Sequence, residues 1–430
     1  MKKFLVIVII SVWCGTLFAA DLVMSGQSNK TYANATYGHL SISNSSNIIV
    51  RNCKFSTSNS ANNSAGGVAD INGSNHITID SCDFNGDTTT CTGINVGGSY
   101  ITIEHCTIHD IADDGFQCGN GDHINFLQNT ICHLYGCGTD GGCGPCYNGH
   151  SDGFELSHLD TVVLSGNLVF DVRSTSAVIL DNYSGGVTVH NLVLENNIFY
   201  TPETGVIVYV FYVDGIKMYN NTFWKSNWLG VAVGPSVSRL EAYNNIVQCI
   251  DYNFLSGNYN ASDHKYDYNL VGFAGRGLTA QAHDVVSNDP KFQRIPPAND
   301  NTATHLYRNV TPADFALMAG SPAIGKGTSG GTIPTTDFFG NPRTVPYDMG
   351  AIQHVSAATA PLIMRGTTAA LMKNAMVTVY DLLGRRLAVG ASNTVSWNGA
   401  THHGVSLKRG LYFVQLRSEG KTEALKFFIN

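Results

Sequence analysis

The chain has 430 residues, of which 13% are charged and 45 are Gly, and its formal net charge is −7. This length predicts two or three units, or one elongated unit, rather than one small domain. The low charge and the many Gly and β-branched residues favour stacked β-structure over helical bundles. The negative charge and the lack of a basic cluster argue against nucleic acid as a partner.

Residues 1–20 have the pattern of a secretory signal peptide. Two lysines precede the apolar run Phe4–Val12, and small residues end at Ala20, where we expect cleavage. The mature protein is therefore predicted to leave the cytoplasm. A lipoprotein attached at Cys14 is the alternative, although the preceding Trp fits that pattern poorly.

From residue 48 to residue 269, a short apolar strand ending in Asn or Cys recurs nine times. Successive copies are 23 to 38 residues apart, and most steps are close to 24. A repeat of this length predicts a β-solenoid, because each coil buries its inner face only by stacking on the next one, ~4.8 Å away. The anchor residues are Cys53, Cys82, Cys106, Asn129, Asn167, Asn197, Asn221, Asn245 and Asn269.

The anchors predict a column of like residues at one corner of the solenoid. An Asn amide there can hydrogen-bond to the Asn above and below it and satisfy turn backbone that would otherwise be buried unpaired. Cys53, Cys82 and Cys106 take the same column in the first three coils. We expect them to be buried core thiols.

This coil pattern resembles the right-handed parallel β-helix proteins, in particular the carbohydrate-active and polysaccharide lyase-like group, whose coils read apolar-x-apolar-x-Asn-Asn-x-Phe. The resemblance covers roughly residues 38–355. It implies an all-β chain with a β-helix of about nine coils over residues 21–275. It also implies a substrate groove, floored by strands that begin about ten residues after each anchor.

Two of these floor strands open with Asp-Gly-Phe, at Asp114 and Asp152. On neighbouring coils the two carboxylates would lie ~5 Å apart, so that one would have a raised pKa unless a cation binds between them. They predict acid–base catalysis, or a calcium site completed by Glu155. The alternative is that Asp-Gly only turns the chain into the strand.

Further candidates lie near this pair. His150 could accept a proton or bind a metal, and Gln117 could bind sugar hydroxyls. The related lyases use a Lys or Arg to take the C5 proton of a uronic acid. This resemblance makes Arg173, on the coil after Asp152, the candidate base or acidic-sugar ligand.

A second candidate cation follows two coils later. Lys225 occupies the turn that corresponds to that of Arg173, and Trp224 and Trp228 beside it could stack on sugar rings. A surface position without function is the alternative for each.

About 14 residues are inserted between the anchors Asn129 and Asn167, and the insertion is Cys-rich. Long turns beside the groove are where binding walls can form. Its cysteines predict two disulfides, with a zinc site or free thiols as alternatives. They are Cys132, Cys137, Cys143 and Cys146.

The last part of the chain changes character twice. Residues 276–358 look like the segment that closes the open end of many secreted bacterial β-helices. Residues 359–430 fit a small β-sandwich and resemble the C-terminal sorting domains of the type IX secretion route, which implies contact with an outer-membrane secretion machinery. A carbohydrate-binding or spacer module is the alternative.

The sequence thus predicts a secreted, monomeric polysaccharide lyase that cleaves a uronic-acid polysaccharide by β-elimination, with Ca²⁺ as a candidate cofactor. A glycoside hydrolase that uses Asp114 and Asp152 is the second prediction. A non-catalytic surface adhesin is the third.

Overall fold

The computed structural model describes most of residues 19–354 and the strands of a C-terminal unit. The described ranges before the C-terminal strands are 19–57, 66–87, 90–135, 151–180, 189–202, 204–226, 229–234, 236–248, 263–272, 280–296 and 310–354. The chain divides into two compact units, Met1–His354 and Val355–Asn430. Within the described residues, no helix has the length and apolar character needed to cross a membrane.

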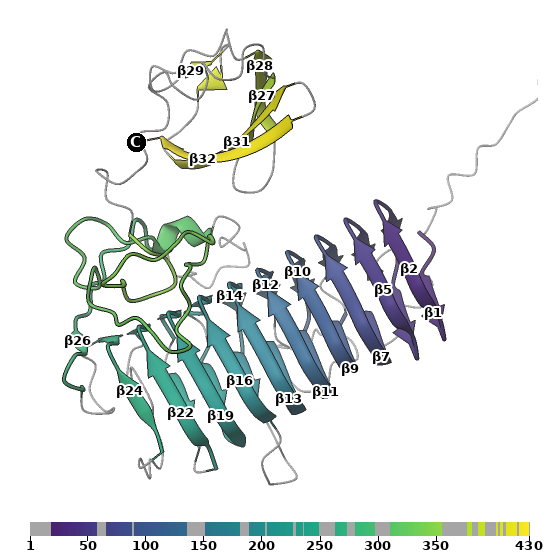
Figure 1. Ribbon diagram of the computed structural model, residues 1–430. Coiled ribbons are helices and arrows are strands. Elements are labelled where there is room, and N and C mark those ends of the chain that lie inside the picture. The colour runs from purple at the N-terminus through teal and green to yellow at the C-terminus, as the bar shows by residue number, and fades with distance from the viewer. Residues whose placement is uncertain are drawn as a thin grey trace, which may run out of the picture. The chain divides into compact units, whose positions relative to one another are not determined.

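The first unit is a parallel β-helix, as the repeat predicts. Its strands pair in parallel into two sheets, and neighbours in each sheet come from successive coils (Figure 1). Sheet A contains β1 (Leu22–Ser25), β2 (Ser28–Ala33), β4 (Leu40–Ser43), β5 (Ser46–Arg51), β7 (Gly67–Asp80), β9 (Thr92–Glu104), β11 (Asp114–Leu127), β13 (Asp152–Ser165), β15 (Ser176–Leu180), β16 (Val189–Glu195), β18 (Val206–Val210), β19 (Val213–Tyr219), β21 (Leu229–Val233), β22 (Ser238–Tyr243) and β24 (Lys265–Asp267).

Sheet B consists of shorter strands on the other side of the core. These are β3 (Thr36–Tyr37), β6 (Lys54–Ser56), β8 (Asp83–Asn85), β10 (Thr107–Ile111), β12 (Thr130–Leu134), β14 (Leu168–Val172), β17 (Ile198–Tyr200), β20 (Thr222–Trp224), β23 (Ile246–Gln248), β25 (Leu270–Val271) and β26 (Val285–Val286). One coil therefore runs through sheet A, turns at the anchor residue, and returns through sheet B.

The long strands of sheet A bend in the middle and divide the sheet into two halves. The register of β11 against β9 shifts between Cys118 and Asp122, and that of β7 against β9 shifts between Ile71 and Ser74. A bulge of this kind kinks a strand and increases its twist. We call the part before the bend the first half of sheet A; it contains the strands predicted to floor a groove.

Alternating apolar side chains fill the interior. In β5, Ile48 and Val50 are fully buried while Ile49 between them is 40% exposed. Parallel, in-register pairing also places like residues over one another. The rings of Phe116 and Phe154 stack with centroids 5.1 Å apart and planes 4° from parallel. Burial of this continuous column, at about 25 cal/mol per Å² of apolar surface, is the main stabilising contribution.

The predicted Asn ladder is present. Oδ1 of Asn197 accepts hydrogen bonds from the backbone N–H and the side-chain amide of Asn167, both at 2.9 Å, and the same pattern repeats from Asn129 to Asn269. The sequence did not reveal that Asp284 continues this column, by accepting from the backbone N–H of Asn269 at 2.7 Å. Before the ladder, Cys53, Cys82 and Cys106 are buried free thiols, as predicted.

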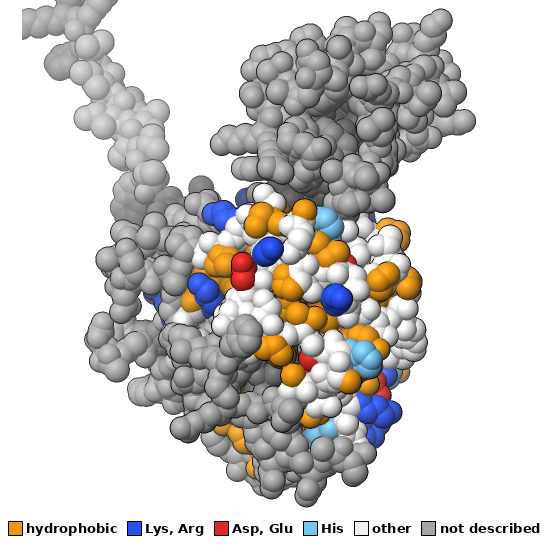
Figure 2. All heavy atoms as spheres, turned by 90° about the vertical axis from the view of Figure 1, so that its left-hand side faces the viewer, with side chains coloured by type: hydrophobic (Ala, Val, Ile, Leu, Met, Phe, Trp, Pro, Cys, Tyr) orange, Lys and Arg blue, Asp and Glu red, His pale blue; other side chains and the backbone are white. Residues whose placement is uncertain are grey.

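The segment that follows the coils packs along the flank of the rod. Tyr200 and Trp224 point outward from sheet B and contact the rings of Phe315 and Phe292, with centroids 5.5 and 4.9 Å apart. The segment includes a short 3-10 helix, η3 (Pro312–Phe315). These contacts place it against the outer face of sheet B, and its strand β26 pairs with β25 at the end of that sheet. The predicted closure of the open end by this segment stays a prediction. Figure 2 views this end, where single hydrophobic and basic side chains are interspersed.

The first residue of each Asn-Asn pair fixes this segment. The side-chain amides of Asn196, Asn220 and Asn244 donate to backbone carbonyls of the segment at 3.0, 3.2 and 2.8 Å. Nη2 of Arg343 returns a hydrogen bond to Oδ1 of Asn196 at 2.7 Å. In each pair, therefore, the second Asn builds the ladder and the first Asn binds the flanking segment.

The second unit is described by its strands alone. An antiparallel sheet has the order β28 (Arg386–Ala391), β27 (Met376–Tyr380), β31 (Gly410–Ser418) and β32 (Lys421–Ile429). A separate antiparallel pair joins β29 (Thr401–His402) to β30 (Val405–Ser406).

Candidate functional site

The candidate site lies where sheet B leads into the first half of sheet A. Here β10 and β14 end shortly before β11 and β15 begin, whereas the Cys-rich insertion separates the end of β12 from the start of β13. Asp110, His133 and Asp171 occupy the same place on three successive coils, each in the left-handed backbone region with φ of 57°, 56° and 53°. Short polar side chains tolerate this conformation better than branched ones. The local turn thus stacks two carboxylates and an imidazole in one column.

Asp114 and Asp152 open β11 and β13 on neighbouring coils, as predicted. Oδ1 of Asp114 accepts a hydrogen bond from the backbone N–H of Asp152 at 2.9 Å, and Oδ1 of Asp152 accepts one from the hydroxyl of Ser176 at 2.5 Å. Both residues are buried, with 4% and 0% of their surface exposed. The sequence had suggested two accessible carboxylates; the structure links them through the strand backbone instead.

Burial raises the pKa of Asp114 well above its ordinary value, and the nearby carboxylates of Asp113, Asp152 and Glu155 raise it further. The raised pKa makes Asp114 the candidate general acid of this group.

Gln117 and Glu155 lie on the outer face of the first half of sheet A. They pair across β11 and β13, and Nε2 of Gln117 donates to Oε2 of Glu155 at 3.0 Å. Their neighbours Phe116 and Phe154 are fully buried, so the two polar side chains point away from the core. The structure brings Glu155 near Asp114, as the pKa of Asp114 indicates.

A second polar group adjoins the first at the ends of the sheet B strands. We call it the charge ladder, because acidic and basic side chains alternate along it through four coils. Oδ1 of Asp83 lies 3.0 Å from Nε2 of His109, and Oδ2 of Asp110 lies 2.7 Å from Nδ1 of the same imidazole. Its members are Asp83, His109, Asp110, His133, Asp171 and Arg173.

The remaining steps of the charge ladder run to Arg173. Oδ1 of Asp110 is 3.6 Å from Nδ1 of His133, and Nε2 of His133 is 3.9 Å from Oδ2 of Asp171. Nε of Arg173 lies 3.1 Å from Oδ1 of Asp171. The Arg173 guanidinium also lies over the ring of Tyr135, 4.8 Å from its centroid, a cation–π distance.

Three groups of the charge ladder and its neighbourhood have shifted pKa values. Although burial opposes the change, hydrogen bonds to Asp110 and Asp83 raise the pKa of His109 to about 9. The hydrogen bond from His109, and then the contact with His133, hold the pKa of Asp110 well below its usual range. Burial, together with the hydrogen bond that Tyr135 donates to Asp110, raises the pKa of the Tyr135 hydroxyl. His109 and Asp110 are thus an ion pair at neutral pH.

The two groups are adjacent along the chain. Ser174 follows Arg173, and its backbone N–H donates to Oγ of Ser151 at 3.1 Å; Ser151 directly precedes Asp152. Arg173 and Asp152 are thus each next in sequence to one partner of this hydrogen bond between a backbone N–H and a side-chain hydroxyl. The ion pair that the structure gives Arg173 is with Asp171, a residue the sequence did not single out.

Other predicted site residues are placed differently or lie outside the described residues. Trp224 is 1% exposed and packs against Phe292, so the prediction that it stacks on sugars is wrong. Lys225 has a left-handed backbone, and its N–H donates to the carbonyl of Gln248. His150 and Trp228 lie outside the described residues.

The Cys-rich insertion is described only at its start. Cys132 is a buried free thiol, so the predicted disulfide pairing does not include it. Burial raises the pKa of this thiol well above its ordinary value, and the nearby charges of Asp171, Asp110 and Asp83 raise it further. The insertion's remaining cysteines, Cys137, Cys143 and Cys146, lie outside the described residues.

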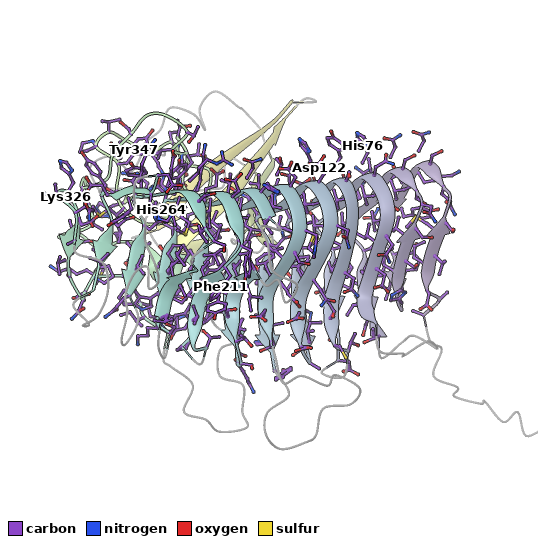
Figure 3. All side chains as sticks on the ribbon, turned by 90° about the horizontal axis from the view of Figure 1, so that it is seen from below. His76, Asp122, Phe211, His264, Lys326 and Tyr347 are labelled. Carbon is purple, nitrogen blue, oxygen red and sulfur yellow. The ribbon has the colours of Figure 1, made fainter. Side chains whose placement is uncertain are left out.

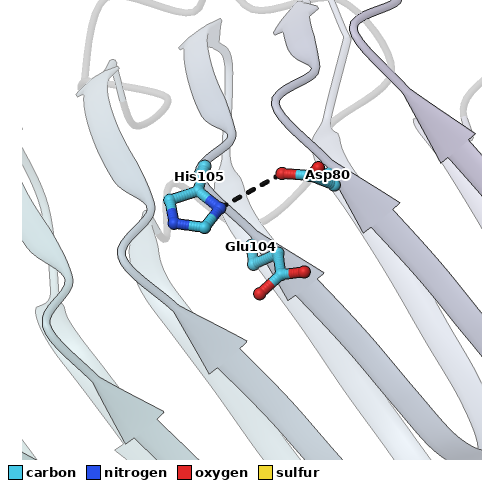
Figure 4. Close-up of side chains that lie close together, drawn as sticks. All are labelled: Asp80, Glu104 and His105. Atoms are coloured by element: carbon cyan, nitrogen blue, oxygen red, sulfur yellow. Dashed lines mark hydrogen bonds and ion pairs between the residues drawn. The ribbon is translucent and has the colours of Figure 1, made fainter. Parts of the chain in front are cut away.

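Among the described residues, the side chains that could hold a metal ion lie elsewhere than the sequence predicted. Ligand atoms of Asp80, Glu104 and His105 lie within 4.8 Å of one another (Figure 4), whereas Asp114, Asp152 and Glu155 do not form such a group. Both imidazole nitrogens of His105 are engaged, by Asp80 at 3.1 Å and by Gln128 at 2.7 Å. We therefore assign no metal to either group.

The charge ladder could have been found by aligning the coils on their anchors. Asp110, His133 and Asp171 each stand four residues after an anchor, and Arg173 stands six residues after Asn167. The full alternation of charge is visible only when the coils are stacked, because a single coil contributes at most two of these residues, such as His109 with Asp110 or Asp171 with Arg173.

Comparison with known proteins leaves the chain without a family assignment. No family model matches it, and no curated protein matches it. Among solved structures, pectate lyase Pel9A matches with 17% identity and a TM-score of 0.38, covering 76% of this chain and 87% of that one. XylC bound to xylose matches with 12% identity and a TM-score of 0.42, covering 73% of this chain and 67% of that one.

The surface adhesin PfbA of Streptococcus pneumoniae matches with 14% identity and a TM-score of 0.36, covering 56% of this chain and 73% of that one. Structural similarities this weak support no conclusion about function. We assign the parallel β-helix from the strand pairings themselves, which are parallel from β1 to β26.

Proposed function

We propose that this chain is a secreted polysaccharide-degrading enzyme, and that it cleaves a uronic-acid polysaccharide by β-elimination. The observation that carries the proposal is the hydrogen bond that joins Asp114 to Asp152 on the neighbouring coil, with Glu155 near them. Burial and the neighbouring carboxylates raise the pKa of Asp114, and a carboxyl group of raised pKa beside a second carboxylate can supply an acid and a base at one place.

The proposed reaction uses this pair across one sugar linkage. The carboxylate of Glu155 takes the proton from C5 of the uronic acid, and the C4–O4 bond breaks as the C4–C5 double bond forms. Asp114 gives its proton to the departing O4. Glu155 is the base because it is partly exposed on the outer face, whereas Asp152 is fully buried.

Arg173 supports an acidic rather than a neutral substrate. A uronate entering a face lined by Asp and Glu carboxylates needs a compensating positive charge. The guanidinium of Arg173 is held between Asp171 and the Tyr135 ring, and its planar fork matches a carboxylate. Arg173 therefore binds the sugar carboxylate in this proposal instead of acting as the base.

The predicted calcium ion does not enter this reaction. Asp114, Asp152 and Glu155 offer oxygen donors of the type Ca²⁺ prefers, yet their ligand atoms do not converge within 4.8 Å. Ca²⁺ remains a prediction that a chelator tests: loss of activity in EDTA that CaCl₂ restores would support it.

A glycoside hydrolase is the second candidate, because the hydrogen bond from the backbone of Asp152 holds two carboxyl-bearing residues on adjacent coils. In that reaction Asp114 again donates the proton to the leaving oxygen. The substrate would then be a neutral glycan, for which Arg173 is dispensable.

The deciding experiment is a panel of acidic and neutral polysaccharides, read by ultraviolet absorbance and by reducing ends. The lyase predicts new absorbance from the unsaturated product, and losses of at least ~100-fold in Asp114→Asn and Glu155→Gln. Asp122→Asn is the matched control, because Asp122 lies on the same strand with its side chain 42% exposed. Reducing ends without absorbance would favour the hydrolase, and binding without either product would favour the adhesin.

We also propose export and surface delivery. Residues 1–20 act as the signal peptide, and residues 359–430 act as a sorting domain read by an outer-membrane secretion machinery. Cell fractionation tests this proposal: deletion of residues 359–430 should retain the protein inside the outer membrane, whereas unchanged secretion would favour a spacer or binding module.

A further inference from the structure

We propose that His133 is a positioning residue: it holds the buried carboxylate of Asp171, which in turn fixes Arg173 for a carboxylate-bearing sugar. The inference rests on the proposed function for its choice of ligand. The contacts that carry it belong to the described residues of β12 and β14 and do not depend on the reaction.

Asp171 is the centre of this arrangement. Its side chain has no exposed surface, and its two carboxylate oxygens face two different basic groups. Oδ1 meets Nε of Arg173 at 3.1 Å, and Oδ2 faces Nε2 of His133 at 3.9 Å without any hydrogen-bond partner. A carboxylate removed from water in this way is strongly destabilising unless it is paired.

His133 is itself confined on several sides. Its side chain is 12% exposed, and its Nε2 is buried without a hydrogen bond. Its Nδ1 faces Oδ1 of Asp110 at 3.6 Å. The Phe170 ring meets the imidazole edge-on, with centroids 6.0 Å apart. The charged groups facing His133 from the neighbouring strands are thus Asp110 on β10 and Asp171 on β14.

The geometry makes His133 a bridge between two coils. Its Nδ1 faces Asp110 and its Nε2 faces Asp171, so each ring nitrogen is directed at a carboxylate. Closing the 3.9 Å gap to Asp171 needs a shift of about 1 Å to reach hydrogen-bond distance. With His133 in place, both oxygens of Asp171 face a basic group, and Arg173 is held in one orientation.

The positioning role of His133 predicts a larger effect on substrate binding than on the chemical step. If His133 is replaced, Asp171 loses one of its two partners and draws Arg173 toward itself. Arg173 then meets the sugar carboxylate less well, so the Michaelis constant should rise while the turnover number changes little.

The experiment compares His133→Leu and His133→Gln with the control His123→Gln. His123 is a suitable control because its backbone is also left-handed, with φ of 55° against 56°, and its side chain is 47% exposed. The first readout is the hydrogen exchange of the Arg173 Nε–H by NMR, with the signal assigned through its loss in Arg173→Lys. We expect exchange at least ~10-fold faster in His133→Leu, an intermediate rate in His133→Gln, and no change in the control.

The second readout is steady-state kinetics on the uronic-acid polysaccharide. We expect KM to rise ~10-fold in His133→Gln with kcat within ~2-fold of wild type. Unchanged Arg173 exchange in both His133 variants would overturn the proposal. Should His133→Leu fail to fold, His133→Gln decides alone. If no polysaccharide is cleaved, the proposed function fails, whereas the NMR result still decides the role of His133.

Discussion

The backbone N–H of Asp152 donates a hydrogen bond to Oδ1 of Asp114 over 2.9 Å. Two site residues from neighbouring coils are therefore joined through the strand itself and not through a flexible loop. Rigid elements hold reacting groups more accurately than loops do. Any rearrangement of Asp114 must also disturb the first residue of β13.

Asp114→Asn should stabilise the protein at neutral pH while removing activity. A carboxyl whose folded-state pKa is raised lowers stability as pH rises above its ordinary value of 3.8. Asn keeps the oxygen that accepts from Asp152 and carries no charge. We expect the melting temperature to rise by roughly 2–4 °C at pH 7 and to be unchanged at pH 3. A lower melting temperature at pH 7 would contradict this account.

His109→Asn should destabilise the protein in a pH-dependent manner. The pKa of His109 is raised to about 9, so the stability from its ion pair is fully present below its ordinary value of 6.5 and is lost as pH rises through 9. Asp110 has a lowered pKa, so it contributes stability at pH values above its ordinary pKa of 3.8, and this contribution is lost as the pH falls. The difference in melting temperature between the variant and the wild type should therefore be largest near pH 6 and should become smaller toward pH 9. His123→Asn should show no such narrowing.

Asn197→Ala should break the Asn ladder. The substitution leaves the backbone N–H of Asn167 and one of its two side-chain amide hydrogens without an acceptor, and the carbonyl of Leu164 without the amide that donates to it. Buried groups left in this state cost ~1–3 kcal/mol each, and we expect a total loss of roughly 2–4 kcal/mol in urea unfolding. Asn125→Ala on the outer face, whose bond to Thr102 is 3.4 Å long, should change stability by less than ~0.5 kcal/mol.

Arg343→Met should release the flanking segment from the rod. Arg343 is 7% exposed and donates to Asn196 and to the carbonyls of Gly350 and Ala351. Limited proteolysis should cut the segment faster in this variant. Arg294→Met is the control, because the partner of Arg294 is Asp314, which belongs to the segment itself, so this variant leaves the attachment to Asn196 intact. Equal proteolysis of the two variants would refute the anchoring role.

The described free thiols should resist labelling in the folded protein. All five are buried, and burial raises the pKa of Cys118 and Cys132 well above their ordinary values, which disfavours the reactive thiolate. A thiol reagent should modify them only as the β-helix unfolds. They are Cys53, Cys82, Cys106, Cys118 and Cys132.

The fold was predictable because the same local signal recurs in every coil. The step from Asn197 to Asn221 to Asn245 is 24 residues each time, and period-2 burial of the preceding strands follows from it. The route of the segment after Asn269 was not predictable in the same way. Its docking depends on single contacts, such as that of Phe292 with Trp224. No sequence repeat indicates these contacts.

The candidate site was predictable only in part. Asp114 and Asp152 were visible because the Asp-Gly-Phe motif repeats, and the effect of Asp152 on the pKa of Asp114 follows from adjacency of the coils. The environment of Arg173 was not visible, since Tyr135 comes from the preceding coil and meets it only through stacking. The burial of both aspartates was not predictable, because the exposure of a strand's first residue depends on the turn before it.

Figure 3 displays side chains along the rod, with His76 and Asp122 projecting outward on its surface.

The flanking segment binds Asn196, Asn220 and Asn244, which recur at intervals of 24 residues on consecutive coils. Inserting or deleting a coil among them would put these attachment points out of step with the segment. The docked segment therefore fixes the number of coils between Asn196 and Asn244, and we expect whole coils to be gained or lost outside this stretch.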